Sequence, residues 1–483
     1  MINLLRVRHR CHLLVQMLWT LCLGSPLMGS TWVTPSVFAE SGDNSNNILA
    51  PENTASDPSH MAAAVAPEPV AQEKWNAHGQ FTLVGQFNPD FHAPYRGQNS
   101  FAKGNQARET IDLTLFLGGH LWEGGEFYAD GELDQGFGIG NTLGIAGYVS
   151  GEAYRVGKTL PYLRMPRAFL RQTFALGNAT ESVESAANQL AGPQPVDKVT
   201  FTIGKFSVAD IFDTNKYAHD PRGDFLNWSV IDSGAFDYAA DAWGYSFGAA
   251  AEWTQSWWTL RAGAFNLSTL PNSKRLERHF DQYALISEVE ERHAWFGHPG
   301  KLKLLGFVNQ GRMGDYMEAV RLAQATGNPA DATLVRRDSS RPGIALNLEQ
   351  EISAGIGAFA RLSYNDGSKE AFDFTDINKS ISMGVSFDGL RWGRASDKAG
   401  IAQVFNGLSR QAQHYFAVGG LGLLIGDGQL PHYAMEKITE IFYSMQLVSH
   451  LLVTADYQFV DAPAYNSDRG PVSVLGLRIH AEF

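Results

Sequence analysis

The sequence predicts an all-β protein: a transmembrane antiparallel β-barrel of about 16 strands, with short periplasmic turns and long extracellular or infolded loops. Three observations support this fold class. Segments in which apolar and polar side chains alternate recur from residue 78 to the end, as expected of strands between lipid and a wet lumen. No segment beyond the first 39 residues reaches the roughly 18 consecutive apolar residues of a helical span. The alternation continues to the last residue, Phe483, where a closed barrel must pair its final strand with its first.

Residues 1–39 have the features of a signal peptide. Three arginines precede a largely apolar run at residues 13–28, and a small-residue cleavage motif ends at Ala39. A lasting membrane anchor is the alternative, but polar residues, Gly and Pro interrupt the run. Both cysteines, Cys11 and Cys22, lie in this segment, so the mature chain depends on neither disulfides nor thiolate chemistry.

Residues 40–77 are predicted to form a disordered periplasmic leader, because the stretch is rich in Ser, Asn, Ala, Pro and Glu and poor in large apolar residues. The remaining residues, 78–483, are assigned to the barrel. Cleavage after Ala39 would remove three basic residues and no acidic one, so the mature chain is more acidic than the −12 of the full sequence. This charge excludes nucleic acid as an expected partner.

The alternation is regular enough to assign the two faces of each strand. In one segment, Leu113, Leu115 and Leu117 oppose Asp112 and Thr114. The polar faces hold Thr, Ser, Asp, Arg and Gln, which suits a water-filled lumen better than the Lys- and Glu-rich outer face of a soluble sandwich. The segments with this pattern are residues 80–87, 110–121, 167–176, 199–203, 258–264, 344–349, 356–364, 381–387 and 451–459.

The last strand is predicted to close the barrel against the first, residues 80–87. Its apolar face, which should meet lipid, carries Leu475, Leu477, Ile479, Ala481 and Phe483. Arg478 and His480 lie on the opposite face and should point into the lumen. Phe483 is also the predicted assembly signal, read by the barrel-assembly machinery of the outer membrane.

Turn lengths alternate along the chain. A short turn at residues 123–125 contrasts with long connections such as 135–165, 177–196 and 207–240. In outer-membrane barrels the short turns face the periplasm and the long loops face outward. Residues 315–326 have helical spacing of apolar side chains and predict a short helix within a loop.

No motif for catalysis or metal binding is present. HExxH, CxxC and GxSxG are absent, and the 14 histidines show no ligand spacing. Residues 151–159 look like a phosphate-binding loop, but five residues separate the glycines where that loop has four. The chain is therefore expected to be no enzyme and to need no metal or other cofactor.

A pore is selective at its narrowest point, where infolded loops meet lumen-facing strands. The connections 135–165 and 207–240 are the candidates for this constriction, because they are long and carry charged and aromatic residues. The predicted eyelet residues are Glu152, Arg155, Arg167, Arg171, Asp213, Arg222 and Trp228. For each of them the alternative is a solvated lumen or loop side chain with no special role.

Several stretches, which together span nearly all of the chain from about residue 75, resemble one family. They are residues 91–100 (FHAPYRGQNS), 146–153 (AGYVSGEA), 167–172 (RAFLRQ), 204–213 (GKFSVADIFD), 215–222 (NKYAHDPR), 225–228 (FLNW) and 463–471 (PAYNSDRGP). The chain resembles the carbohydrate-selective porins of the OprB family, with the last two stretches the most specific. There are three departures from the family pattern. Residues 128–132 lack an expected Asn-Pro, the 177–196 insertion looks longer than usual, and the leader at residues 40–74 is extended.

The resemblance implies a 16-stranded barrel in the outer membrane of a Gram-negative bacterium. It also implies facilitated diffusion of glucose-like monosaccharides and polyols through an eyelet of arginines and acidic residues. The expected partners are a small-molecule carbohydrate, outer-membrane lipid and the barrel-assembly machinery. Family barrels are often trimers, so a homotrimer is a further expectation.

Three hypotheses for function follow from the sequence. The leading one is a passive porin for sugar uptake. The alternative is an outer-membrane exporter or structural barrel associated with exopolysaccharide, although a polyanion exporter would favour a lumen densely lined with Lys and Arg. The third is a soluble extracellular β-enzyme, which solubility of the mature chain without detergent would support.

Overall fold

The computed structural model describes residues 71–153 and 156–483. The predicted signal peptide, most of the predicted leader and Arg155 lie outside the described residues. The first strand, β1, begins at Trp75, within the range assigned to the leader.

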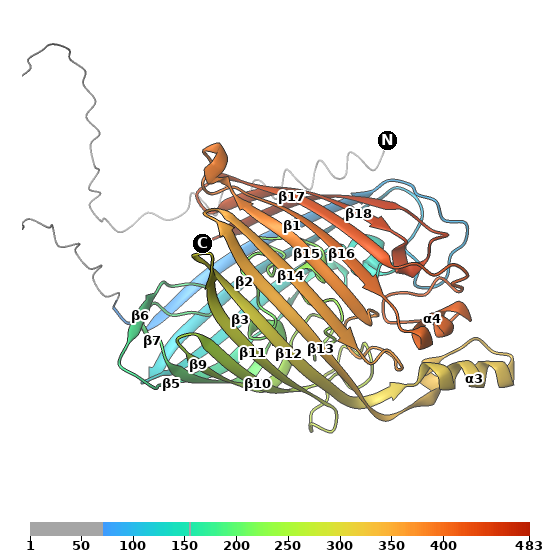
Figure 1. Cartoon of the computed structure of the whole chain (residues 1–483), viewed down its shortest axis with the longest axis horizontal. Coiled ribbons are helices and arrows are strands. Elements are labelled where there is room, and N and C mark those ends of the chain that lie inside the picture. Colours follow the sequence, from blue (N-terminus) through green and yellow to red (C-terminus); the bar gives the residue numbers. More distant parts are fainter. Residues whose placement is uncertain (1–70, 154–155) are drawn as a thin grey trace, which may run out of the picture. The chain divides into compact units, whose positions relative to one another are not determined.

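The described chain forms a closed antiparallel barrel with 16 positions in its wall, which confirms the predicted fold class (Figure 1). β4 and β5 share one position, because both pair with β3 and the chain between them leaves the sheet. The wall strands are β1 Trp75–Asn88, β2 Gln106–Trp122, β3 Gly125–Gly136, β4 Lys158–Arg164, β5 Ala168–Ala175, β8 Lys198–Phe206, β9 Ser246–Gln255, β10 Trp258–Asn266, β11 Tyr283–Trp295, β12 His298–Gly314, β13 Arg336–Ser353, β14 Ile356–Asn365, β15 Lys379–Asp388, β16 Lys398–Gly407, β17 Glu436–Val448, β18 Leu451–Asp461 and β19 Val472–Glu482.

The last strand closes the barrel against the first, as the alternation predicts. β19 pairs with β1 from Gln80 opposite Glu482 to Phe87 opposite Leu475. Beyond the strand, the Phe483 backbone N–H donates to the carbonyl oxygen of Gly79 at 2.9 Å. The Phe483 ring lies over Gly79, where an added Cβ would sit 2.3 Å from it, so a side chain at this position would displace the ring.

The wall has its apolar side outward. In β2, Leu113 and Leu115 are 44% and 51% exposed, whereas Asp112 and Thr114 are 3% and 1% exposed. This is the reverse of a soluble sheet, in which the apolar side is the buried one. The same inversion holds in β19, where Leu477 is exposed and Arg478 is buried. Lipid is the solvent that such an outer face requires.

Exposed tryptophans gather at the end of the barrel that carries the short turns. Trp122, Trp257 and Trp295 lie beside the turns that follow β2, β9 and β11. Trp and Tyr prefer the boundary between lipid and water, so these residues mark one membrane interface. Trp243, in contrast, belongs to the infolded connection between β8 and β9, and its Nε1 donates to Tyr162 Oη at 2.8 Å.

Long connections leave the opposite end, where α3 and α4 lie in Figure 1. The helix predicted at residues 315–326 is present as α3, capped by Asp315, whose side chain accepts from the Glu318 backbone N–H at 2.9 Å. Among the described residues, no helix is long and apolar enough to cross a membrane. The helices are α2 Trp228–Ile231, α3 Tyr316–Thr326 and α4 Arg410–Ala417, with 3-10 turns η1 Ile139–Thr142, η2 Val208–Asp210, η3 Ala332–Val335, η4 Gly389–Trp392 and η5 Pro463–Tyr465.

The connection from β8 to β9 folds back into the barrel instead of projecting from it. Phe212, Phe225 and Phe236 in this loop are fully buried. Phe225 packs edge-on against Phe359 of β14 and Phe442 of β17. The loop therefore forms an apolar core together with inward-facing side chains of the wall, and it narrows the barrel from within.

The connection at residues 177–196 does not belong with the long loops. It lies between β5 and β8 at the short-turn end, where it forms a hairpin of β6 Thr180–Val183 and β7 Gly192–Pro195 (Figure 1). The alternation of short turns and long loops therefore fails here. The insertion adds length at the end that otherwise carries tight turns.

Candidate functional site

Two cavities follow one another inside the barrel. The loop-side cavity has a volume of about 300 Å³ and is lined mainly by infolded loops. The turn-side cavity has a volume of about 940 Å³ and reaches the short turn after β9. Five side chains line both cavities and lie where the two meet. These residues, named the eyelet here, are Arg167, Asp210, His219, Asp220 and Arg222.

Arg167 enters the eyelet from the break between β4 and β5. Its Nε and Nη2 donate to the two carboxylate oxygens of Asp210 at 2.8 and 2.6 Å, a bidentate pair. Nη1 lies 3.3 Å from Asp130 Oδ2, and the guanidinium carbon lies 5.0 Å from the centre of the Tyr245 ring. The guanidinium is therefore held on three sides, and its position is set before any solute arrives.

Arg222 enters from the infolded loop and stands among three carboxylates. Its guanidinium nitrogens lie 3.5 Å from Glu152 and 3.9 Å from each of Asp112 and Asp220. Each eyelet arginine is thus balanced by neighbouring acids. The constriction offers N–H donors and carboxylate acceptors side by side, which suits hydroxyl groups that both donate and accept.

The structure brings some of the predicted residues together and separates others. Arg167 and Arg222 belong to the eyelet, and Glu152 lines the loop-side cavity beside Arg222. Arg171 lines only the turn-side cavity. Asp213 lines neither cavity and is buried where the infolded loop meets the barrel wall.

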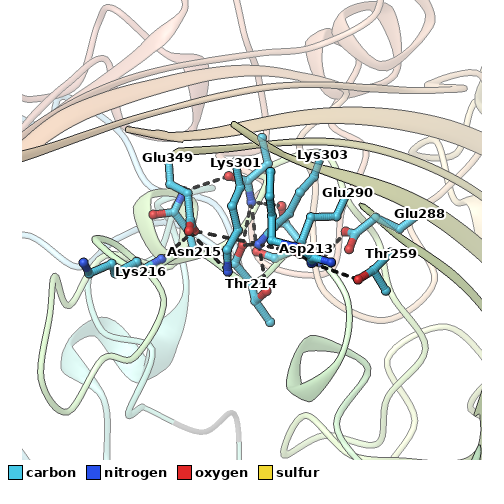
Figure 2. A network of polar contacts seen from close by, with 12 residues as sticks. Asp213, Thr214, Asn215, Lys216, Thr259, Glu288, Glu290, Lys301, Lys303 and Glu349 are labelled. Carbon is cyan, nitrogen blue, oxygen red and sulfur yellow. Dashed lines mark hydrogen bonds and ion pairs between the residues drawn. The ribbon is translucent and has the colours of Figure 1, made fainter. Parts of the chain in front are cut away.

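Asp213 anchors the loop to the barrel. Its carboxylate accepts from the Ser233 backbone N–H at 2.6 Å and from Asn347 Nδ2 at 2.7 Å. Its own backbone N–H donates to Glu288 Oε2 at 2.8 Å. Figure 2 shows the segment from Asp213 to Lys216 against side chains of β11, β12 and β13, with Lys303 donating to Thr214 Oγ1 at 2.8 Å. A predicted eyelet residue thus positions the loop that carries the eyelet.

Trp228 borders the loop-side cavity, but its ring packs against other aromatic rings. The ring stacks on Tyr148 at 5.3 Å and on Phe374 at 6.0 Å, centre to centre, and the residue is 2% exposed. A sugar ring needs an open aromatic face for stacking. Because Trp228 is almost completely buried, it offers a sugar no open ring face.

Asp210 belongs to the eyelet but is not among the predicted residues, although the sequence carries a local signal at this position. It lies three residues after Ser207, the spacing of a capping box, and its Oδ2 accepts from the Ser207 backbone N–H at 2.9 Å. That motif predicts a turn but not its partner. His219 and Asp220 belong to the long connection 207–240, which the sequence singles out only as a whole. The fold of this loop places their side chains at the eyelet.

Asp232 is a titratable side chain in the lining of the loop-side cavity. It lies in the infolded loop, where burial raises its pKa to about 6, although His219, 3.9 Å away, lowers it. Asp213, Arg361 and Tyr238 are its other charged or titratable neighbours. Because the folded protein binds this proton more tightly than the unfolded chain, this group's contribution to stability falls as pH rises from 3.8 to about 6.

Above pH 6 the ionised Asp232 should make the channel more cation-selective. We therefore expect the reversal potential in a KCl gradient across a planar bilayer to shift as pH passes through this value. Asp232→Asn should lose that part of the shift while keeping the contributions of other groups. Superimposable curves for the two proteins would show that Asp232 does not act on permeating ions.

Comparison with known proteins agrees with the fold. The model of the family described as carbohydrate-selective porin, OprB family, matches residues 98–483. The high-pH structure of Pseudomonas putida OprB aligns with a TM-score of 0.65 and 16% identity, over 85% of this chain and 94% of that one. The outer membrane channel DcaP of Acinetobacter baumannii aligns with a TM-score of 0.46 and 11% identity, over 86% of this chain and 98% of that one. A search among curated proteins finds no match. The chain therefore belongs to the carbohydrate-selective porins of the OprB family and is a sugar channel of the Gram-negative outer membrane rather than an enzyme.

Proposed function

We propose that the channel passes neutral monosaccharides and polyols of glucose size into the periplasm and discriminates against larger sugars at the eyelet. The observation that carries this proposal is the meeting of two cavities at Arg167, Asp210, His219, Asp220 and Arg222. Because the arginines are balanced by adjacent acids, a neutral solute meets little net charge there. Its hydroxyl groups can still exchange hydrogen bonds with both kinds of side chain.

Passage also requires that no contact holds the solute too strongly. Arg167 already donates to Asp210 in a bidentate pair. Only its remaining N–H donors are available to a sugar hydroxyl group. Weak, shared contacts of this kind favour exchange along the channel. In this proposal the solute enters through the loop-side cavity, passes the eyelet, and leaves through the larger turn-side cavity.

Arg167→Ala should reduce size discrimination, because it removes a long side chain from the junction of the two cavities. In liposome swelling, the rate with a disaccharide relative to glucose should at least double. Arg336→Ala is the matched control, since Arg336 pairs with Glu370 and lines neither cavity. Equal discrimination in the two variants and the unsubstituted protein would remove Arg167 from the selective site.

A further inference from the structure

The hairpin between β5 and β8 is unlike the other connections at the short-turn end. The turns after β2 and β11 span only Glu123–Gly124 and Phe296–Gly297, whereas this connection occupies residues 176–197. Its base is closed by the Leu176 backbone N–H, which donates to the Asp197 carbonyl oxygen at 2.9 Å. The hairpin is therefore an ordered structure with its own pairing.

The tip of the hairpin turns back into the channel. Asn76 of β1 donates through Nδ2 to Ser185 Oγ at 2.9 Å and to the Gln189 carbonyl oxygen at 2.8 Å. Leu190 is buried, and its backbone N–H donates to Tyr128 Oη at 3.2 Å. Lumen-facing side chains of β1 and β3 thus hold the tip against the inner wall.

The tip itself is a tight turn. Ala186 and Gln189 exchange two backbone hydrogen bonds of 3.0 Å across it. Asn188 has φ of 57°, a left-handed conformation that Asn tolerates better than most residues. The two hydrogen bonds between Ala186 and Gln189 fix the positions of Ala187 and Asn188 at the centre of the turn.

This turn is linked to the arginines of the channel. Asn188 Nδ2 donates to Asp130 Oδ2 at 3.0 Å, and the same oxygen lies 3.3 Å from Arg167 Nη1. Arg171 Nη1 donates to the Asn188 carbonyl oxygen at 3.1 Å. Ala187, Asn188 and Gln189 all line the turn-side cavity. A solute that leaves the eyelet therefore enters a space with the hairpin tip as part of its wall.

We propose that residues 187–189 form a second size filter at the periplasmic exit, in series with the eyelet. The filter acts on the sugars named under the proposed function and rests on that proposal for its solute. The location of the filter does not depend on which solute passes, because the hairpin tip would restrict ions and sugars alike. Asn188 and Gln189 supply amide groups that can hydrogen-bond a passing hydroxyl group.

Thiol labelling tests the filter directly. Ala187→Cys places a thiol on the cavity wall, and a bulky charged methanethiosulfonate added from the periplasmic side should at least halve both KCl conductance and glucose swelling. Ser182→Cys is the matched control, since Ser182 is exposed on β6 of the same hairpin and lines neither cavity. The unsubstituted protein reports any effect of the reagent that does not depend on the introduced thiol. Complete labelling of Ala187→Cys, verified by mass, with unchanged conductance would overturn the filter.

A second variant tests the anchoring of the tip without chemical modification. Asn76→Ala removes the donor to Ser185 and Gln189, so passage of a disaccharide relative to glucose should rise. Asn88→Ala is the control, because Asn88 lies on the same face of β1 but bonds to the Pro89 and Gly104 carbonyl oxygens. Equal ratios for both variants would count against the filter. Conductance that is blocked by labelling in a channel that admits no glucose would overturn the proposed function and leave the filter standing.

Discussion

Replacing Arg361 by methionine should release the infolded loop and at least double the single-channel conductance. Arg361 projects from β14 into the barrel and is fully buried. It donates to the Val230 carbonyl oxygen at 2.7 Å and to the Ala218 carbonyl oxygen at 2.8 Å, and its Nε lies 3.4 Å from Asp213 Oδ1. Removing one partner of a buried ion pair costs about 3–5 kcal/mol, because the other charge stays buried without compensation.

The wall should survive this change, since its strands are held by their own hydrogen bonds. Retained heat-modifiable migration on gels would show that the barrel is intact, and planar bilayers would report conductance. Arg336→Met is the matched control, because Arg336 bonds to Glu370 rather than to the infolded loop and lines neither cavity. Arg361→Lys should fall between the two, since an ammonium cannot reproduce the forked donors. An inserted Arg361→Met channel of normal conductance would show that the loop does not depend on this anchor.

Leu477→Arg should strongly destabilise the barrel in lipid. Leu477 lies in the middle of β19, pairs with Gly85 and Ala455, and is exposed on the outer face. An arginine on the lipid face at the bilayer midplane costs about 2–4 kcal/mol, and near the interface about 0–1 kcal/mol. The free energy of unfolding, measured by guanidinium titration in lipid vesicles, should fall by the larger amount.

Ser473→Arg provides the matched comparison, because Ser473 lies on the same face of β19 near its loop end. It should cost far less than Leu477→Arg, even with the loss of its 3.0 Å hydrogen bond to Tyr457. Equal losses for both variants would mean that the strand does not cross the membrane in the proposed register. The comparison therefore tests depth as well as the identity of the lipid face.

Much of the wall could be predicted because a strand encodes its two faces locally. Leu475 and Leu477 were assigned to lipid and Arg478 to the inside, and the structure confirms each assignment. The pairing of β19 with β1 also followed, since a closed barrel leaves its last strand no other free neighbour. The helix α3 was predictable for the same reason, because its cap and its spacing lie within one short segment.

The inside of the barrel was less predictable. Arg478 was expected in the pore wall, but it is fully buried and donates to the Asp224 carbonyl oxygen at 2.9 Å. Asp213 and Trp228 likewise support the loop through contacts with Asn347, Tyr148 and Phe374. A polar residue in an alternating strand can be assigned to the inner face of the barrel. Its polarity does not distinguish a side chain that meets water from one that holds an infolded backbone.

The sequence by itself therefore determined the class of the fold, the faces of the strands that its alternation identifies, and the closing pair. These depend on a period of two residues and on the demands of lipid. Only the tertiary structure decided which charged residues meet at the eyelet. Arg167 comes from a break in the wall and Arg222 from a loop, and their carboxylate partners Asp112, Asp130 and Glu152 are scattered along the chain. The inward turn of the hairpin at residues 176–197 was decided in the same way, by Asn76 and Asp130 on distant strands. Contacts of this kind join residues far apart in sequence, and no local pattern encodes them.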